Sequence, residues 1–151
     1  MKPAIKFYFR KMEILTDNGA VARYYSDLVY AVLDDLNNCW LHFVDGVKYR
    51  VEVSLLYLQH NLPTKPFFRC NRTSIVNLCY YVEYMERSAM IIMSDGASFR
   101  LSVRNIKSFK KQKDGMTRIS PLCPPCLKCN NEGCPDFGLF CLRPEQLLAE
   151  E

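Results

Sequence analysis

The alternation of apolar and polar positions predicts short β-strands along much of the chain. Ile5, Phe7 and Phe9 alternate with polar residues, which is the period of a strand with one buried face. Residues 21–33 are rich in aromatic and β-branched side chains, so we expect one or two strands there, interrupted near Ser26. The first third of the chain is therefore expected to be β-structured.

The strongest hairpin pattern lies in residues 39–53. Two runs of period two flank Asp45-Gly46, a dipeptide that is typical of a two-residue type I′ turn. Further along the chain, shorter runs of the same kind predict three more strands, at residues 79–84, 90–93 and 98–103. The expected arrangement is an antiparallel meander.

Short helices are expected at two places. Ser54 can cap a helix whose apolar positions continue to Leu62, where Pro63 ends it. A basic stretch after Arg104 can start a second helix that ends by Gly115. The predicted fold class is thus mostly β, with one or two short helices.

Composition supports a globular protein. The chain has 151 residues, of which 49% are hydrophobic and 24% are charged, so wholesale disorder is excluded. No run of 18 apolar residues is present, and residues 1–20 lack the pattern of a secretory signal. We therefore expect one cytoplasmic domain with a short appendage, and no membrane partner.

Charge is unevenly distributed along the chain. Residues 65–118 contain eleven Lys and Arg against four Asp and Glu, and residues 119–151 contain two against five. A basic segment that also contains strands is a candidate surface for a polyanion, because neutralised phosphates release counterions. A solvated basic face explains the charge alone equally well.

Motifs of enzymes are missing from the sequence. It contains neither a phosphate-binding glycine loop nor Gly-x-Ser-x-Gly, and neither His42 nor His60 has a nucleophile or metal ligand at an informative spacing. We therefore do not expect the protein to be an enzyme.

Two sequence blocks resemble a known family. Residues 67–77 (FFRCNRTSIVN) and 101–107 (LSVRNIK) are similar to the signature blocks of the LytTR DNA-binding domain, the output domain of many bacterial response regulators. Residues 25–30 and 54–62 resemble a strand and a short helix of the same family. The resemblance covers about residues 20–112. It implies an elongated, mostly antiparallel β fold whose loops enter successive major grooves of duplex DNA.

The resemblance also implies a division of the chain. We expect an N-terminal extension at 1–19, a LytTR-like DNA-binding domain at 20–112, and a Cys-rich tail at 113–151. No βαβ pattern precedes residue 20, so we expect no receiver domain and no switching by aspartyl phosphorylation within the chain. The implied function is sequence-specific transcriptional regulation on promoter repeats, as two copies on double-stranded DNA, without a required cofactor.

Residues that contact DNA follow from the same resemblance. Arg104 is the first candidate for base readout, because its forked donors match guanine O6 and N7 together. Asn71 and Thr73 replace the usual His and Ser, so base preferences should differ from those of the family. The other candidates for base or phosphate contact are Asn105, Asn71, Arg72 and Asn38, and those for phosphate alone are Arg69, Lys107, Lys110 and Lys111. An ordinary surface arginine is the alternative for Arg72 and Arg104.

The C-terminal cysteines predict a metal site. In a chain without an export signal, clustered cysteines indicate metal binding or redox chemistry before disulfides. Four thiolates around zinc is the leading interpretation, and an iron–sulfur cluster is less favoured because the spacing before the fourth cysteine is one residue too long. Free thiols and a reactive dithiol also stay open. The five residues are Cys123, Cys126, Cys129, Cys134 and Cys141.

Two functions of other classes remain open at this point. A β surface with exposed aromatic side chains can bind RNA by stacking. Alternatively, the β domain serves only as the scaffold of a metal or redox protein.

Overall fold

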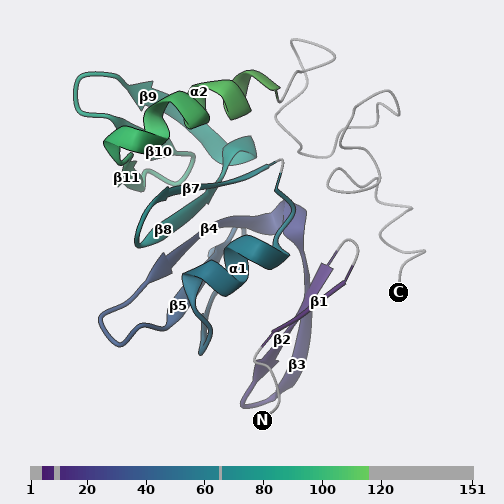
Figure 1. The fold of residues 1–151 in the computed structure, drawn as a ribbon. Helices are drawn as coiled ribbons and strands as arrows, with labels where there is room; N and C mark the ends of the chain where they lie inside the picture. The colour runs from purple at the N-terminus through teal and green to yellow at the C-terminus, as the bar shows by residue number, and fades with distance from the viewer. Residues whose placement is uncertain (1–4, 9–10, 65, 116–151) are drawn as a thin grey trace, which may run out of the picture.

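A computed structural model describes residues 5–8, 11–64 and 66–115 of the chain (Figure 1). The structure contains mostly β-strands, together with two α-helices and three short 3-10 helices (η). In chain order the elements are β1 (Ile5–Phe7), β2 (Lys11–Thr16), β3 (Gly19–Tyr24), η1 (Tyr25–Asp27), β4 (Leu28–Leu33), β5 (Cys39–Phe43), β6 (Lys48–Val51), α1 (Leu55–Asn61), β7 (Phe67–Asn71), β8 (Ser74–Asn77), η2 (Leu78–Tyr80), β9 (Tyr81–Met85), β10 (Met90–Met93), β11 (Ser98–Arg100), η3 (Val103–Asn105) and α2 (Ile106–Gly115).

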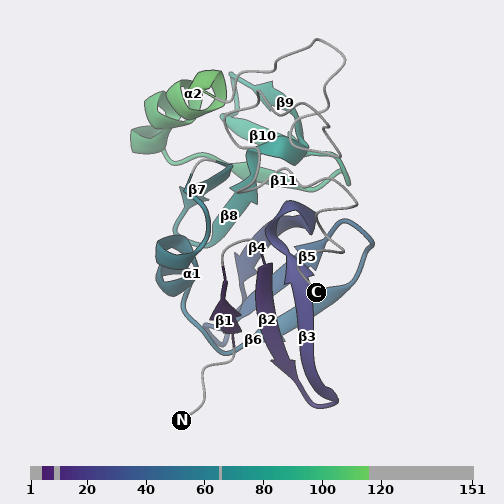
Figure 2. The ribbon, with the colours of Figure 1, turned by 90° about the vertical axis from the view of Figure 1, so that its right-hand side faces the viewer.

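The strands form three antiparallel sheets. Their orders are β1-β2-β3, β6-β5-β4-β8-β7 and β11-β10-β9. Figure 2 shows the sheets following one another along the long axis of the molecule, with the five-stranded sheet between the other two. The predicted class, an elongated and mostly antiparallel β fold with short helices, is confirmed.

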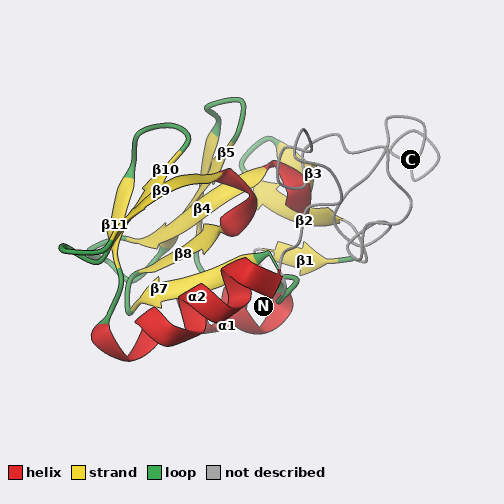
Figure 3. Ribbon diagram, turned by 90° about the horizontal axis from the view of Figure 1, so that it is seen from above, coloured by secondary structure: helices red, strands yellow, loops and turns green. Residues whose placement is uncertain are grey.

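Both helices lie on the same side of the strands (Figure 3). Helix α1 begins where the Ser54 hydroxyl accepts a hydrogen bond from the Tyr57 N–H at 3.0 Å, as expected for an N-cap. Its buried residues Leu55 and Leu58 face the five-stranded sheet. Neither α1 nor α2 is long and apolar enough to cross a membrane.

Helix α2 is attached mainly through one aromatic side chain. Phe109 is fully buried, and its ring lies 5.8, 5.7 and 5.0 Å from the rings of Phe68, Tyr81 and Tyr84, centroid to centroid. These partners come from β7 and β9, so Phe109 joins the helix to two different sheets. The basic residues of α2 are positioned by this contact.

A buried amide joins two strands of the central sheet and caps η2. The Asn77 Nδ2 group donates to the carbonyl of Leu28 at 2.8 Å, and its Oδ1 atom accepts from the N–H of Cys79 at 2.9 Å. Asn77 is completely buried, so both bonds satisfy backbone groups that have no access to water. Its side chain therefore holds β8 against β4 at the point where η2 begins.

The structure corrects one expected turn. A type I′ turn needs positive φ at both central residues, but only Gly46 (φ 86°) has it, and Asp45 does not. Instead, the Gly46 N–H donates to the Phe43 carbonyl at 2.9 Å, and the Asp45 carboxylate accepts from the Val47 N–H at 3.1 Å. The predicted type I′ turn is wrong, because the Asp side chain stabilises a longer turn by bonding its own backbone.

Strand ends also differ from the expectations. Residues 79–80 lie in η2, residues 101–102 lie outside any regular element and residue 103 begins η3, so β9 and β11 are shorter than predicted. The sheet pairing stops after Arg100, whose carbonyl accepts a hydrogen bond from a side chain instead of a neighbouring strand. This early end of β11 creates the turn in which Arg104 lies.

Candidate nucleic-acid interface

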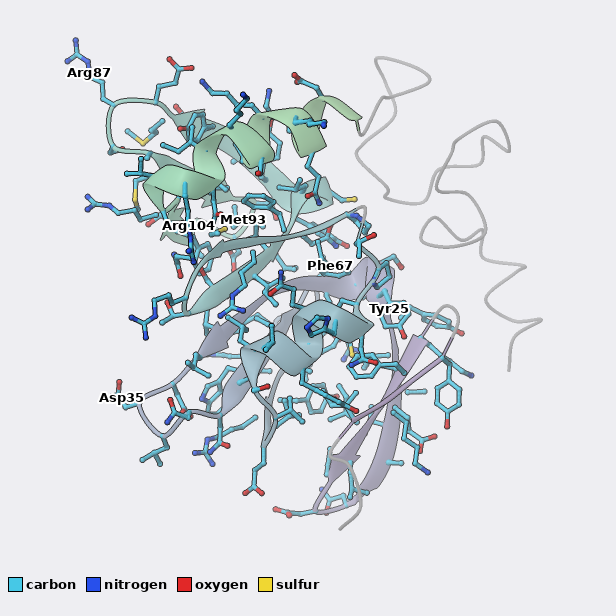
Figure 4. The ribbon with its side chains drawn as sticks, in the orientation of Figure 1. Tyr25, Asp35, Phe67, Arg87, Met93 and Arg104 are labelled. Carbon is cyan, nitrogen blue, oxygen red and sulfur yellow. The ribbon has the colours of Figure 1, made fainter. Side chains whose placement is uncertain are left out.

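Turns from different parts of the chain gather on one side of the molecule. Figure 4 shows Asp35 in the β4–β5 turn, Arg104 in η3 and Arg87 in the β9–β10 turn, all toward its left-hand side. The β7–β8 turn, which contains Arg72, lies beside η3. These turns therefore present a series of loop residues along the long axis of the fold.

The β7–β8 turn is fixed by the side chain of Asn71. Its Oδ1 atom accepts hydrogen bonds from the Thr73 N–H at 2.8 Å and the Ser74 hydroxyl at 3.0 Å. Its Nδ2 group donates to the carbonyl of Arg100 at 2.6 Å, across 29 residues of sequence. Asn71 thus links this turn to the end of β11. These bonds position the turn, whereas the sequence suggests Asn71 as a direct DNA contact, and that contact stays a prediction.

A second set of bonds holds η3 against β7. The N–H of Ser102 donates to the Cys70 carbonyl at 3.0 Å, and Asn105 Nδ2 donates to the same oxygen at 3.1 Å. The Asn105 amide therefore faces the interior of the site. Both bonds place the backbone of Arg104, which lies between these two residues, next to the β7–β8 turn.

Arg69 is occupied by internal contacts. Its Nε donates to the Asn71 carbonyl at 3.1 Å, Nη1 to Gln59 Oε1 at 3.0 Å, and Nη2 to the Arg72 carbonyl at 3.0 Å. The guanidinium spans from α1 to the β7–β8 turn. In this structure Arg69 stabilises the turn that carries Arg72, and its expected phosphate contact stays a prediction.

Arg72 and Arg104 have a different environment. Both are exposed, and within the described residues no hydrogen bond or ion pair involves either guanidinium. They lie between two surface hollows of about 480 and 570 Å³. The first hollow is lined by Gln59, Pro63, Thr64, Phe67, Phe68, Arg69, Asn71, Arg72, Ile75, Arg104, Asn105, Ser108 and Gln112, and the second by Asn71, Arg72, Thr73, Arg100, Leu101, Ser102 and Arg104. Five of the nine residues expected at DNA therefore meet at one place.

The lysines of the prediction lie on α2. Lys107 and Lys111 are exposed, whereas the Lys110 ammonium lies 3.5 Å from the Glu86 carboxylate. An exposed ion pair of this kind contributes little, so Lys110 remains able to exchange Glu86 for a phosphate. None of the three lines either hollow.

Asn38 lies apart from this cluster, in the β4–β5 turn. Its backbone N–H donates to Asp34 Oδ1 at 3.0 Å. The Arg50 guanidinium, 2.9 Å from the same carboxylate, lowers the pKa of Asp34 to about 2. Asn38 therefore lies beside the Asp34 carboxylate, which is ionised at neutral pH and whose negative charge is partly balanced by the Arg50 guanidinium. A DNA contact by Asn38 remains a prediction, and the structure does not bring it to the hollows.

One residue of the cluster was missed in the sequence. Arg100 is exposed and lines the second hollow together with Arg72 and Arg104. The available signal was its place at the outward position of a short strand immediately before the second signature block. Alternation alone does not show which outward residues face the site.

The thiol of Cys70 lies beneath the cluster and is protected by burial. Cys70 is fully buried, and burial raises the pKa of its thiol to about 12. Since the thiolate is the reactive form, almost none exists at pH 8. We expect iodoacetamide to alkylate Cys70 far more slowly in the folded protein than in urea, as measured by mass spectrometry of its peptide. Equal rates in both states would contradict the buried position.

The Cys-rich tail lies outside the described residues. The zinc or iron–sulfur site expected from Cys123, Cys126, Cys129, Cys134 and Cys141 therefore stays a prediction from sequence. Within residues 5–8, 11–64 and 66–115, no group of three or more His, Cys, Asp and Glu side chains could hold a metal ion.

Comparisons with known proteins agree with the two sequence blocks. The sequence profile of the LytTr DNA-binding domain matches residues 25–114, more than half of the chain. The fold is similar to the solved LytTr DNA-binding domain of a Bacillus cereus protein, with a TM-score of 0.59 and 22% identity over 68% of this chain and 95% of that one. No curated protein matches the chain. The resemblance is confirmed, and this chain belongs to the LytTR family of DNA-binding domains.

Proposed function

We propose that the protein is a transcriptional regulator that recognises a specific sequence in duplex DNA through the turns on one side of its β fold. The observation that carries this proposal is the pair of exposed guanidinium groups of Arg72 and Arg104, which have no partner within the described residues. Unpaired arginines on fixed turns are suited to base edges and phosphates, because five donors are presented in a planar fork.

The proposed roles follow the geometry of the turns. Arg104 reads a base, because it lies in η3 beside Val103, which is 87% exposed and marks the protruding end of this turn. Arg72 lies on the neighbouring turn and contacts the same segment of DNA. Lys107 and Lys111 follow on α2 and hold phosphates, which add affinity and register without sequence information.

Asn71, Asn105 and Arg69 support these contacts from behind. Their side chains bond the backbone of the β7–β8 turn, of the end of β11 and of β7, and so keep the backbones of Arg72 and Arg104 at a fixed separation. A fixed backbone favours specificity, because the turns do not have to be ordered when DNA binds. We further propose that two copies of the protein bind repeated half-sites in promoters. We also propose that the protein acts in the cytoplasm.

Duplex DNA is favoured over single-stranded RNA by the character of the hollows. The two aromatic residues that line them, Phe67 and Phe68, are only 7% and 6% exposed. Sequence-specific recognition of single-stranded RNA uses exposed aromatic faces on which bases stack. Within the described residues the hollows offer charged and amide donors instead, which suit base edges in a groove.

Selection from a randomised pool of duplexes tests the proposal. We expect the full chain to enrich a defined sequence over successive rounds at about 0.15 M salt, because base readout adds to the electrostatic attraction. A randomised pool of single-stranded RNA serves as the control and should yield no enriched motif. Uniform, weak retention of every duplex would overturn the proposed function.

A further inference from the structure

We propose that Arg100, together with Arg72, holds one backbone phosphate of duplex DNA beside the base that Arg104 reads. This inference rests on the proposed function and adds a residue to its contacts. Arg100 lies at the end of β11 and lines the second hollow with the other two arginines. The three guanidinium groups therefore come from three separate positions and border one concave surface.

The backbone of Arg100 is held firmly while its side chain is unpaired. Arg100 pairs with Met90 of the neighbouring strand β10, and its carbonyl accepts a hydrogen bond from Asn71 Nδ2 at 2.6 Å. The side chain is exposed, and no hydrogen bond or ion pair of the described residues involves its guanidinium. The backbone thus fixes where this side chain begins, and its guanidinium keeps all its donors for an anion.

The lining of the second hollow is suited to an anion. Besides the three arginines, it is lined by Thr73 and Ser102, whose hydroxyl groups donate to Asn71 Oδ1 at 2.9 Å and to the Cys70 carbonyl at 3.4 Å. Among the described residues no carboxylate lines this hollow, so its charged side chains are all cationic. Guanidinium groups bind phosphate oxygens through paired hydrogen bonds, so the arginines supply the donors for an anion here.

Some arginines elsewhere in the fold are paired, whereas Arg87 on the β9–β10 turn is exposed and has no partner among the described residues. Arg23 lies 3.1 Å from Asp45 and 4.1 Å from the ring centre of Phe43, and Arg50 lies 2.9 Å from Asp34. Each of these arginines is neutralised within the protein. The three at the second hollow have no such partner within the described residues.

The position of Arg100 favours a phosphate over a base. Leu101, next in sequence, is 2% exposed, whereas Val103 is 87% exposed at the protruding η3 turn. Between Arg100 and the η3 turn that carries Arg104, the chain therefore runs beneath the surface at Leu101 and emerges again at Val103. When η3 enters a groove, Arg100 remains at the rim, where the sugar–phosphate backbone runs.

Salt dependence of binding distinguishes a phosphate contact from a base contact. With the duplex selected above, we expect Arg100→Ala to weaken binding on every sequence by a similar factor. The slope of log affinity against log salt should become smaller by about one, the change for one phosphate contact. Arg100→Lys should keep the slope, because a phosphate accepts a point charge.

Two controls make the result specific to this contact. Lys6→Ala removes the same charge from β1, on the opposite side of the molecule in Figure 1, and should leave the slope unchanged. Thermal unfolding of Arg100→Ala should match the unaltered protein, since the internal bond uses the Arg100 carbonyl and not its side chain. An unchanged slope in Arg100→Ala, a changed base preference, or an equal effect of Lys6→Ala would overturn the assignment.

The outcomes also separate this inference from the proposed function. If the unaltered chain enriches no sequence, the function itself fails, whatever Arg100 does. If the chain enriches a sequence and Arg100→Ala retains both the slope and the affinity, only the phosphate contact fails. Replacing single phosphates of the selected duplex by neutral methylphosphonates then identifies which phosphate Arg100 contacts. At that phosphate alone, the replacement should make the unaltered protein and Arg100→Ala bind equally well.

Discussion

Replacement of Phe109 by alanine is expected to lower the free energy of unfolding by about 3–5 kcal/mol, the range for deleting a buried aromatic ring. Phe109 has no exposed surface, and its ring contacts Phe68, Tyr81 and Tyr84. The deletion leaves a cavity between α2 and two sheets, and the ring partners lie in different strands that cannot all move inward.

Urea denaturation followed by circular dichroism measures this effect. Ser108→Ala is the matched control, because the neighbouring residue is exposed on the same helix and should change stability by less than about 0.5 kcal/mol. A loss below about 1 kcal/mol in Phe109→Ala would mean that α2 is not held by this ring.

The Arg104→Ala variant should lose its preference for the selected duplex over random duplex DNA, and should keep most of its affinity for DNA in general. We expect binding to the selected duplex to fall by about 1–3 kcal/mol, the value of one bidentate base contact. Binding to random duplex DNA should fall much less, because phosphate contacts elsewhere on the surface are unchanged. The fold should be unaffected, since Arg104 is exposed and has no partner within the described residues.

Competition binding with selected and random duplexes measures the difference. Arg104→Lys should behave like Arg104→Ala on the selected sequence, because a single ammonium group cannot pair with both guanine acceptors as a guanidinium does. Lys6→Ala is the control for charge, since Lys6 is exposed on β1, on the opposite side of the molecule in Figure 1 from these turns. Equal losses on both duplexes would reduce Arg104 to a phosphate contact.

Much of the fold could be predicted from short-range patterns. The hairpin of β5 and β6 follows from alternation around Asp45-Gly46, and α1 follows from the cap at Ser54 and the stop at Pro63. These elements are determined by neighbouring residues, so a single sequence is sufficient. The candidate site was proposed from the two blocks that contain Arg72 and Arg104, although composition alone left both arginines as possible surface residues.

Long-range contacts explain what the sequence could not show. An asparagine in a polar stretch can face DNA or its own backbone, and the choice at Asn71 depends on the carbonyl of Arg100, 29 residues away. Arg69 resembles a phosphate contact in sequence, yet Gln59 and two backbone carbonyls surround its guanidinium. Charge type is readable from sequence, but the partner of a charge is determined by the fold.

The Asn71 bridge has a consequence for how binding sites can vary. Because this amide ties the β7–β8 turn to the end of β11, and Asn105 ties η3 to β7, the proposed function has the two turns that carry Arg72 and Arg104 approach DNA as one unit. A substituted base pair then removes one interaction and leaves its neighbour in place. An inserted base pair shifts the helical phase between the two contacted steps, and both interactions are lost together. Operators of this protein should accordingly diverge by substitution while conserving their spacing.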